Sequence, residues 1–90
     1  MLRVEKEPDG SCGTRLLLSG RIQFDRIDCI RSAMNDGSAH KILDLGGVTL
    51  VDAAVVRFLI GCEDEGIEVV QCPPYVREWI RRERAEAGRA

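Results

Sequence analysis

The sequence predicts a small α/β domain: a parallel core sheet with an antiparallel edge strand, packed by helices. Short apolar runs alternate with segments whose apolar residues recur every three or four positions, the pattern of alternating strands and helices. The chain has 90 residues, enough for one hydrophobic core. Its 44% hydrophobic and 31% charged residues are typical of a globular protein. We therefore expect one domain over residues 1–90.

The first two elements are predicted to form a β-hairpin. Leu2–Glu5 alternates apolar and charged residues, which indicates an edge strand with one wet face. Turn-forming residues follow at Pro8–Gly13. Thr14–Ser19 then returns as a second strand, and its three consecutive leucines predict burial on both faces.

A first helix is expected after this hairpin. Phe24, Ile27, Ile30 and Met34 fall at three- and four-residue spacing and predict its buried face. Gly37 suits the left-handed residue that ends a helix.

The third strand and the second helix are predicted from the middle of the chain. Lys41–Leu45 is an apolar run of strand length, and Gly46–Gly47 allows the backbone to bend after it. Asp52 suits an N-cap, because its carboxylate can accept a bond from a free helical amide. The following Ala53–Cys62 is apolar almost all round except at Arg57, which predicts a helix sandwiched by other elements.

The remaining elements are a fourth strand and a third helix. Gly66 closes the second helix, and Ile67–Cys72 is predicted as the strand. Pro73–Pro74 starts the last helix, because proline is tolerated in a first turn. Residues 81–90 have no apolar stripe, so we expect the helix to fray over about these residues. The inward stripe of the helix is predicted to be Val76, Trp79 and Ile80.

The predicted order is therefore β-β-α-β-α-β-α. Strand-helix-strand units require parallel strands joined by right-handed crossovers, so strands two, three and four form the parallel core. The first strand adds antiparallel at an edge.

Charge and hydropathy exclude several classes of function. A formal net charge of −2 gives no reason to expect nucleic-acid binding. The most apolar window, Val48–Cys62, is interrupted by Asp52 and Arg57, which predicts no membrane span or direct insertion. The N-terminus alternates apolar and charged residues and so lacks the apolar region of a secretory signal. We expect a cytoplasmic protein.

The cysteines and the single histidine indicate no catalytic or metal site. No Cys-x-x-Cys pair occurs among the four cysteines, Cys12, Cys29, Cys62 and Cys72. We therefore expect no metal and no cofactor. The cysteines are expected to be reduced, partly buried structural thiols. His40 precedes the third strand, whereas ligand sites in open α/β sheets lie beyond the carboxyl ends of strands. A Cys72–His40 dyad is therefore disfavoured.

Asp44 and Asp52 together could suggest a carboxylate pair. The capping role is the simpler explanation for Asp52. Asp44 interrupts an apolar strand, so it must face a wet groove or receive hydrogen bonds, because a bare buried carboxylate is costly.

The middle of the chain resembles the signature of STAS domains, the family of bacterial anti-sigma factor antagonists. Leu43–Leu45 (Leu-Asp-Leu), Val48 and Asp52 match that signature in kind and spacing, as does Val69–Val70 before Pro73. The element order is also that of the family, and the resemblance covers about residues 2 to 80.

The resemblance implies a switch without its hydroxyl group. In the family an Asp-Ser-Ser-Gly turn opens the second helix, and a serine or threonine there is phosphorylated. Here Ala53, Ala54 and Val55 follow the aspartate, so Ala54 is a degenerate phospho-acceptor position. Whether Thr49 or Ser19 substitutes for the missing serine stays open.

For function, the resemblance implies a non-enzymatic protein-binding module in the signalling that regulates transcription. Its partner would be a kinase-type anti-sigma factor, which would itself hold the ATP. An alternative is an accessory subunit that binds the ATPase of a phospholipid-transporting ABC system. A thiol-dependent enzyme using Cys72 or Cys62 ranks last. The identity of the partner and the oligomeric state stay open. Mapped from the family, the partner-binding surface is Gly20, Arg21, Gln23, Val51, Asp52, Ala53, Ala54, Val55 and Arg57.

Overall fold

The computed structural model describes residues 2–10, 13–35, 37 and 39–87. Along the chain, the strands and helices follow the predicted β-β-α-β-α-β-α order, with a single turn of 3₁₀ helix (η1) before the first α-helix. The elements are β1 (Arg3–Asp9), β2 (Gly13–Ile22), η1 (Phe24–Arg26), α1 (Ile27–Met34), β3 (His40–Val51), α2 (Ala53–Asp64), β4 (Glu68–Val70) and α3 (Pro74–Ala87).

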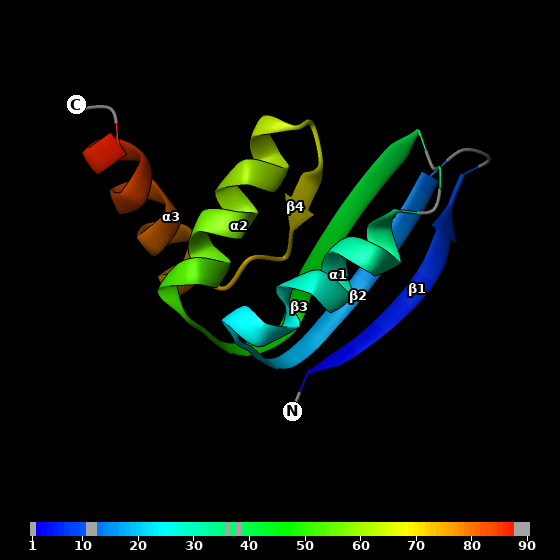
Figure 1. Cartoon of the computed structure of the whole chain (residues 1–90), viewed down its shortest axis with the longest axis horizontal. Coiled ribbons are helices and arrows are strands. Elements are labelled where there is room, and N and C mark those ends of the chain that lie inside the picture. Colours follow the sequence, from blue (N-terminus) through cyan, green and yellow to red (C-terminus); the bar gives the residue numbers. More distant parts are fainter. Residues whose placement is uncertain (1, 11–12, 36, 38, 88–90) are drawn as a thin grey trace.

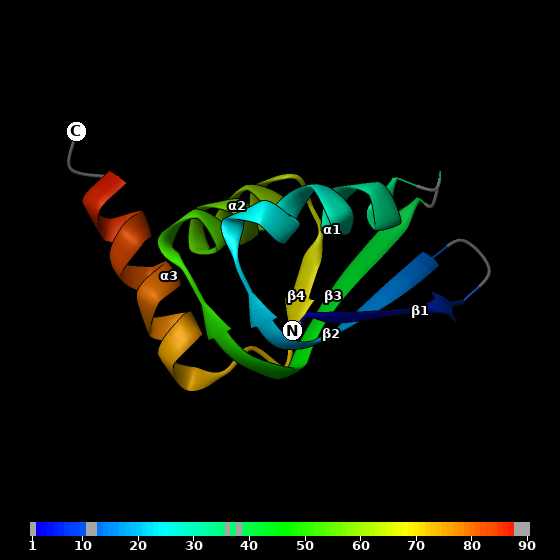
Figure 2. The ribbon, with the colours of Figure 1, turned by 60° about the horizontal axis from the view of Figure 1, so that its bottom comes forward.

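The strands form one mixed sheet in the order β1-β2-β3-β4. β1 pairs antiparallel with β2, while β3 pairs parallel with both β2 and β4, as predicted. α1 and α2 lie over one face of this sheet, and α3 stands at one end beside α2 (Figure 1). Seen from a second direction, the described residues place no helix over the opposite face of the sheet (Figure 2).

This one-sided cover corrects the prediction for β2. Leu16 and Leu18 are each 1% exposed beneath the helices, but Leu17 is only half-buried because it faces the other way. Burial on both faces was therefore wrong.

The strands differ in length from those predicted. β1 continues through Pro8, which pairs with Thr14 and is tolerated because β1 lies at the edge of the sheet. β4 is only Glu68–Val70, since the chain turns out of the sheet at Gln71, whose φ is 56°. The longer strand predicted over Ile67–Cys72 was wrong at both ends.

β3 does not stop at Leu45, as predicted, but continues through both glycines to Val51. Leu17 pairs with Asp44 and Ser19 with Gly47, so β3 carries an extra residue and the pairing shifts by a bulge. A Cβ on Gly47 would lie 2.5 Å from the Cβ of Ser19. Gly47 is therefore needed because β2 and β3 approach closely there, and not because the chain forms a loop.

The core lies between the sheet and the helices. Of the predicted face of α1, Ile30 and Met34 are buried and Ile27 is half-buried, but Phe24 is 69% exposed. Phe24 belongs to η1, whose tighter winding breaks the 3.6-residue period. Gly37 has the predicted positive φ, 83°.

α2 ends as the sequence predicts. Gly66 is left-handed, with a φ of 89°. The amide of Ile67 donates to the carbonyl of Cys62 at 2.9 Å, and the amide of Gly66 to that of Glu63 at 3.1 Å. These two bonds form a Schellman motif, which satisfies the last carbonyls of the helix.

α3 begins at Pro74 and buries Val76 and Ile80, with Trp79 half-buried, as predicted. The helical conformation continues to Ala87, while 88–90 lie outside the described residues. Fraying of this end stays a prediction.

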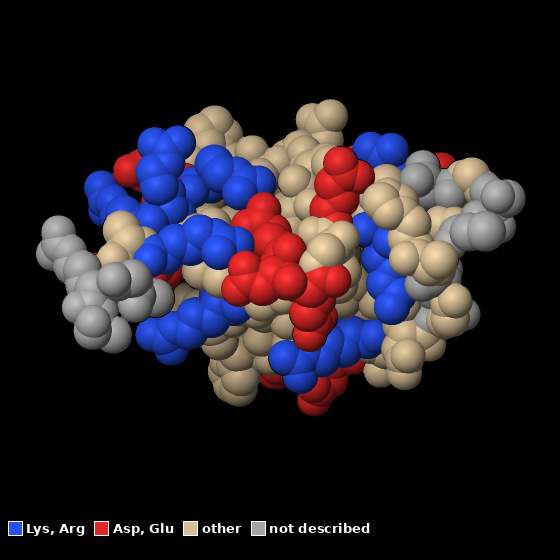
Figure 3. All heavy atoms as spheres, turned by 90° about the horizontal axis from the view of Figure 1, so that it is seen from above, with Lys and Arg blue, Asp and Glu red and all other residues tan. Residues whose placement is uncertain are grey.

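Ion pairs join α3 to the end of α2. Arg84 contacts Glu63 at 3.0 Å and Asp64 at 3.1 Å, and Arg77 contacts Glu63 at 3.1 Å. Figure 3 looks onto the end of the molecule where α2 finishes, and acidic side chains lie there beside basic ones. No helix in the described part of the chain is long and apolar enough to cross a membrane.

Candidate functional site

The edge where β2 and β3 end is the part of the fold that the sequence marked as a partner surface. Ile22 and Val51, the last residues of the two strands, are register partners. η1 follows the first strand and α2 follows the second, so both begin side by side at this edge (Figure 1). Carboxyl ends of parallel strands are where α/β folds commonly place binding residues.

Asp52 joins the two segments. One carboxylate oxygen, Oδ1, accepts the amide N–H of Val55 at 2.9 Å, which confirms the predicted N-cap. The other, Oδ2, accepts the amide N–H of Phe24 at 2.8 Å. Sequence reasoning missed this second bond, because the residues lie 28 positions apart and no local pattern connects them.

Most of the predicted surface residues are accessible, but two are not. Val51 is 6% exposed and Val55 is 0% exposed. Both belong to the core beneath the surface, because Val51 ends β3 on the helix side and Val55 lies on the inner face of α2. Placing these two on the surface was wrong. Gly20, Asp52 and Ala54 are half-buried, and the exposed residues are Arg21, Gln23, Ala53 and Arg57.

Two large apolar side chains at this edge were not predicted. Phe24 is 69% exposed and Leu50 is 49% exposed. Leu50 is the register partner of Arg21, and Phe24 is bonded to Asp52, so they belong with the predicted residues. The exposure of Leu50 follows a second register shift in β3, for which the sequence carries no signal. We call Arg21, Phe24, Leu50, Ala53 and Arg57 the carboxyl-edge surface.

Tyr75 borders this surface from α3. Its hydroxyl donates to the carbonyl of Thr49 at 2.7 Å, and its ring is partly exposed. The bond ties the start of α3 to the end of β3, so the neighbouring backbone is fixed on two sides.

The charges of the carboxyl-edge surface are uncompensated. Arg21 and Arg57 are exposed, and neither forms an ion pair within the described residues. Both guanidinium groups are therefore available to carboxylates of another molecule. The carboxyl edge therefore presents both apolar and cationic side chains to solvent.

Asp44 has a structural role. Its Oδ2 accepts a hydrogen bond from Nη2 of Arg15 at 3.0 Å, and its Oδ1 accepts one from the amide of Gly46 at 2.9 Å. This confirms the expectation that the side chain receives hydrogen bonds. With both oxygens bonded, nothing connects Asp44 to Asp52 as a catalytic pair.

The thiols do not form a reactive centre. Burial, reinforced by the nearby Glu65 carboxylate, raises the pKa of Cys62 from 9.0 to about 11, and burial also raises the pKa of Cys72. Both thiols are therefore protonated at neutral pH and poor nucleophiles. Cys62 and Cys72 are buried and half-buried as predicted, but Cys29 is exposed, which corrects that prediction. Cys12 lies outside the described residues.

His40 lies at the opposite edge of the sheet. It begins β3 and its Nε2 is 3.6 Å from the Glu68 carboxylate. Cys72 follows the carboxyl end of β4, which runs parallel to β3. Val70, the last residue of β4, pairs with Asp44, four positions along β3 from His40 or roughly 13 Å at ~3.3 Å per residue, and Cys72 follows it in the chain. Within the described residues, no group of three or more His, Cys, Asp or Glu side chains could hold a metal ion.

Comparison of the chain with models of known protein families, and with curated proteins, finds no match. The carboxyl-edge surface thus carries the functional argument through its own geometry and chemistry.

Proposed function

We propose that the protein is a non-enzymatic protein-binding module, similar to STAS-type anti-sigma factor antagonists, and that its partner docks on the carboxyl-edge surface. The observation that carries this proposal is the exposure of Phe24 and Leu50 at the edge that also presents Ala53 and two arginines, neither of which has an ion pair among the described residues. Exposed apolar side chains grouped with cations mark interaction sites more often than scattered ones do.

The energetics of this surface suit a specific complex. Complete burial of a Phe or Leu side chain contributes about 1.5–3 kcal/mol, so Phe24 and Leu50 are suitable anchors for binding. The bond from Phe24 to Asp52 fixes η1 against α2 before any partner arrives. A surface formed in advance avoids part of the ordering cost of binding.

The proposed binding is constitutive. Ala54 has no hydroxyl group to receive phosphate, and its neighbour Ala53 has none either. Thr49 is exposed and Ser19 is half-buried, so of the two other hydroxyls considered, only Thr49 is freely accessible to a kinase.

This lack of a switch favours a second candidate partner, the ATPase of an ABC transport system, for which the protein would be a permanent accessory subunit. A permanent interface gains from apolar anchors such as Phe24 and Leu50, and has no need of a phospho-acceptor. A thiol-dependent enzyme ranks behind both, because Cys62 is buried and its pKa is raised.

A capture experiment with paired variants tests the proposal. Tagged wild type, Phe24→Ser and Val4→Ser are compared, since Val4 is also exposed (36%) but lies on β1, away from the carboxyl edge. Proteins retained by wild type and Val4→Ser but lost with Phe24→Ser are identified by mass spectrometry, purified and titrated by calorimetry. The proposal is supported by a kinase-type ATP-binding regulator or an ABC ATPase. Equal retention by all three variants rules out the carboxyl-edge surface.

A further inference from the structure

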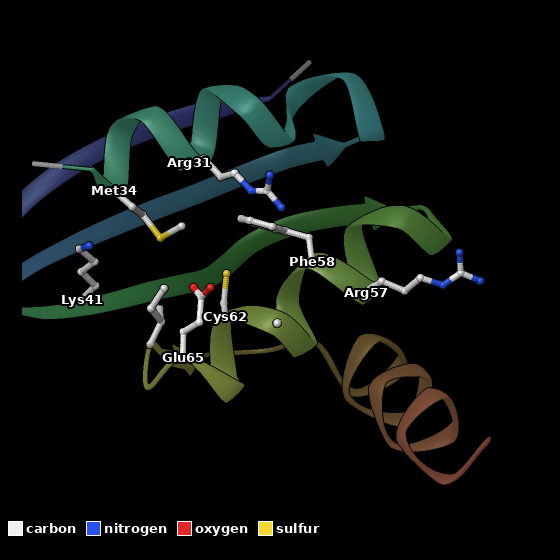
Figure 4. A pocket seen from close by; sticks show the side chains of 9 residues that line it. Arg31, Met34, Lys41, Arg57, Phe58, Cys62 and Glu65 are labelled. Atoms are coloured by element: carbon white, nitrogen blue, oxygen red, sulfur yellow. The ribbon is translucent and has the colours of Figure 1, made fainter. Parts of the chain in front are cut away.

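A second candidate site lies between α1 and α2, away from the carboxyl edge. The two helices frame a cleft of about 300 Å³, towards the amino end of β3 and the carboxyl end of α2 (Figure 4). Arg57 borders it, but its side chain points away from the other labelled residues and so belongs to the carboxyl-edge surface. The cleft is therefore independent of the proposed function.

The walls of the cleft are apolar. Met34 of α1 and Phe58 and Cys62 of α2 line it, and they are only 6%, 8% and 3% exposed. Because burial keeps the thiol of Cys62 protonated at neutral pH, this residue acts as a small apolar group and not as a nucleophile. Because these three side chains are nearly buried, an apolar body placed in the cleft would touch only their outer atoms.

Gly61 lies exposed on α2 at the cleft. It lies inside α2, where glycine costs about 1 kcal/mol relative to alanine. A Cβ at this position would meet no atom within 4 Å, so packing does not require the glycine. A longer side chain at this position would extend from α2 into open space beside the cleft.

Positive charge predominates around the cleft. The Arg31 side chain extends from α1 toward Phe58, and its guanidinium lies 5.4 Å from the centre of the Phe58 ring (Figure 4). Neither Arg31 nor Lys41 has an acidic partner within ion-pair distance among the described residues. Glu65 supplies the one carboxylate of the lining. Among the described side chains of the lining, the cations Arg31 and Lys41 therefore outnumber the carboxylate of Glu65.

We propose that this cleft binds a small organic anion, a carboxylate on a short apolar body. The body packs on Met34, Phe58 and Cys62, and the carboxylate lies at the mouth beside Arg31, where a guanidinium offers paired donors. Octanoate, a carboxylate on a short alkyl chain, has this chemistry and serves as the probe.

Titration of the full chain followed by amide NMR tests the charge preference. Octanoate is compared with octylammonium and octanol, which carry the same alkyl chain. Octanoate is expected to shift the amide signals of Gly61, Cys62 and Glu65 saturably. It should bind about tenfold or more tighter than octylammonium, because one modest charged contact contributes about a factor of ten in affinity. Arg31→Gln should remove most of that preference. Octylammonium binding as tightly as octanoate, or no saturable octanoate binding, overturns the proposal.

Variants of Gly61 test the location. Gly61→Leu places a larger side chain beside the cleft and Gly61→Ala adds one methyl group, while both improve the helix propensity of α2. Gly61→Leu should weaken octanoate binding about tenfold or more, and Gly61→Ala only a few-fold, since the larger side chain obstructs the alkyl chain. Wild-type affinity in a folded Gly61→Leu variant places the ligand elsewhere and overturns the proposal. If Gly61→Leu does not fold, the Arg31→Gln comparison decides.

Discussion

Asp52 is the residue on which local structure and the candidate surface both depend. Its two carboxylate oxygens accept amides from different segments, Val55 in α2 and Phe24 in η1. Only a carboxylate places two acceptor oxygens on so short a side chain; asparagine offers one oxygen and serine one. The residue is therefore more than a helix cap, because it also holds the backbone of Phe24.

Substitutions of Asp52 should separate the two bonds. Asp52→Ala loses the cap, which contributes about 0.5–2 kcal/mol, and the Phe24 bond, which contributes roughly 0.5–1.5 kcal/mol more. Asp52→Asn should keep the cap but lose the bond to Phe24, giving an intermediate free energy of unfolding in urea. Amide hydrogen exchange should then rise at Phe24 and stay slow at Val55. An Asn variant with wild-type protection at Phe24 would show that the second bond contributes nothing.

The thiols give a second prediction at the residue scale. Alkylation of the folded protein at neutral pH should modify the exposed Cys29 well before the buried Cys62, as followed by peptide mass spectrometry. In urea the two should react at similar rates. Fast modification of Cys62 without unfolding would contradict its burial.

The raised pKa of Cys62 also fixes the sign of a pH effect. Below pH 9 the thiol is protonated in both the folded and the unfolded chain and contributes no pH dependence. Between pH 9.0 and about 11 the unfolded chain loses this proton while the folded chain keeps it. The free energy of unfolding should therefore fall across this window, and fall less in Cys62→Ala.

At the scale of elements, the pairing of β2 with β3 depends on a close contact at one glycine. Gly47→Ala would bring a new Cβ within 2.5 Å of the Cβ of Ser19, so the strands must separate or shift. We expect a loss of about 1–3 kcal/mol, the usual range for overpacking, in urea denaturation. Gly61→Ala is the matched control, since its added methyl meets no neighbour and should stabilise α2 by up to about 1 kcal/mol. Equal effects of the two substitutions would contradict the account of Gly47.

The same glycine shows where sequence reasoning about the elements stops. The ends of α2 were predicted because Asp52 and Gly66 act through bonds within a few residues of themselves. The continuation of β3 past Leu45 was not predicted, because paired glycines are typical of bends. Only the contact with the neighbouring strand shows why Gly47 is needed. At the candidate site, helix periodicity placed Phe24 in the core, but the residue lies in η1 and its amide donates to a residue 28 positions away.

Across the whole molecule, the fold places binding features at two separate ends of its helical layer. Phe24 and Leu50 lie at the carboxyl edge, whereas Arg31 and Lys41 border the cleft between α1 and α2. The net charge of −2 would weakly repel an acidic partner at long range. Recognition of such a partner must therefore come from local groups, which are Arg21 and Arg57 at the carboxyl edge.

A pair of charge reversals distinguishes this local recognition from the overall field. Arg57→Glu and Arg82→Glu each change the net charge from −2 to about −4, so both alter the long-range field alike. Arg57 is unpaired on the carboxyl-edge surface, whereas Arg82 lies on α3 in a weak pair with Glu78 at 3.7 Å. With the captured partner, Arg57→Glu should weaken binding about tenfold or more and reverse the salt dependence at this contact, because an attraction is replaced by a repulsion that added salt screens. Arg82→Glu should stay within about twofold of wild type. Equal weakening by both would mean that net charge governs association and that the carboxyl-edge surface does not.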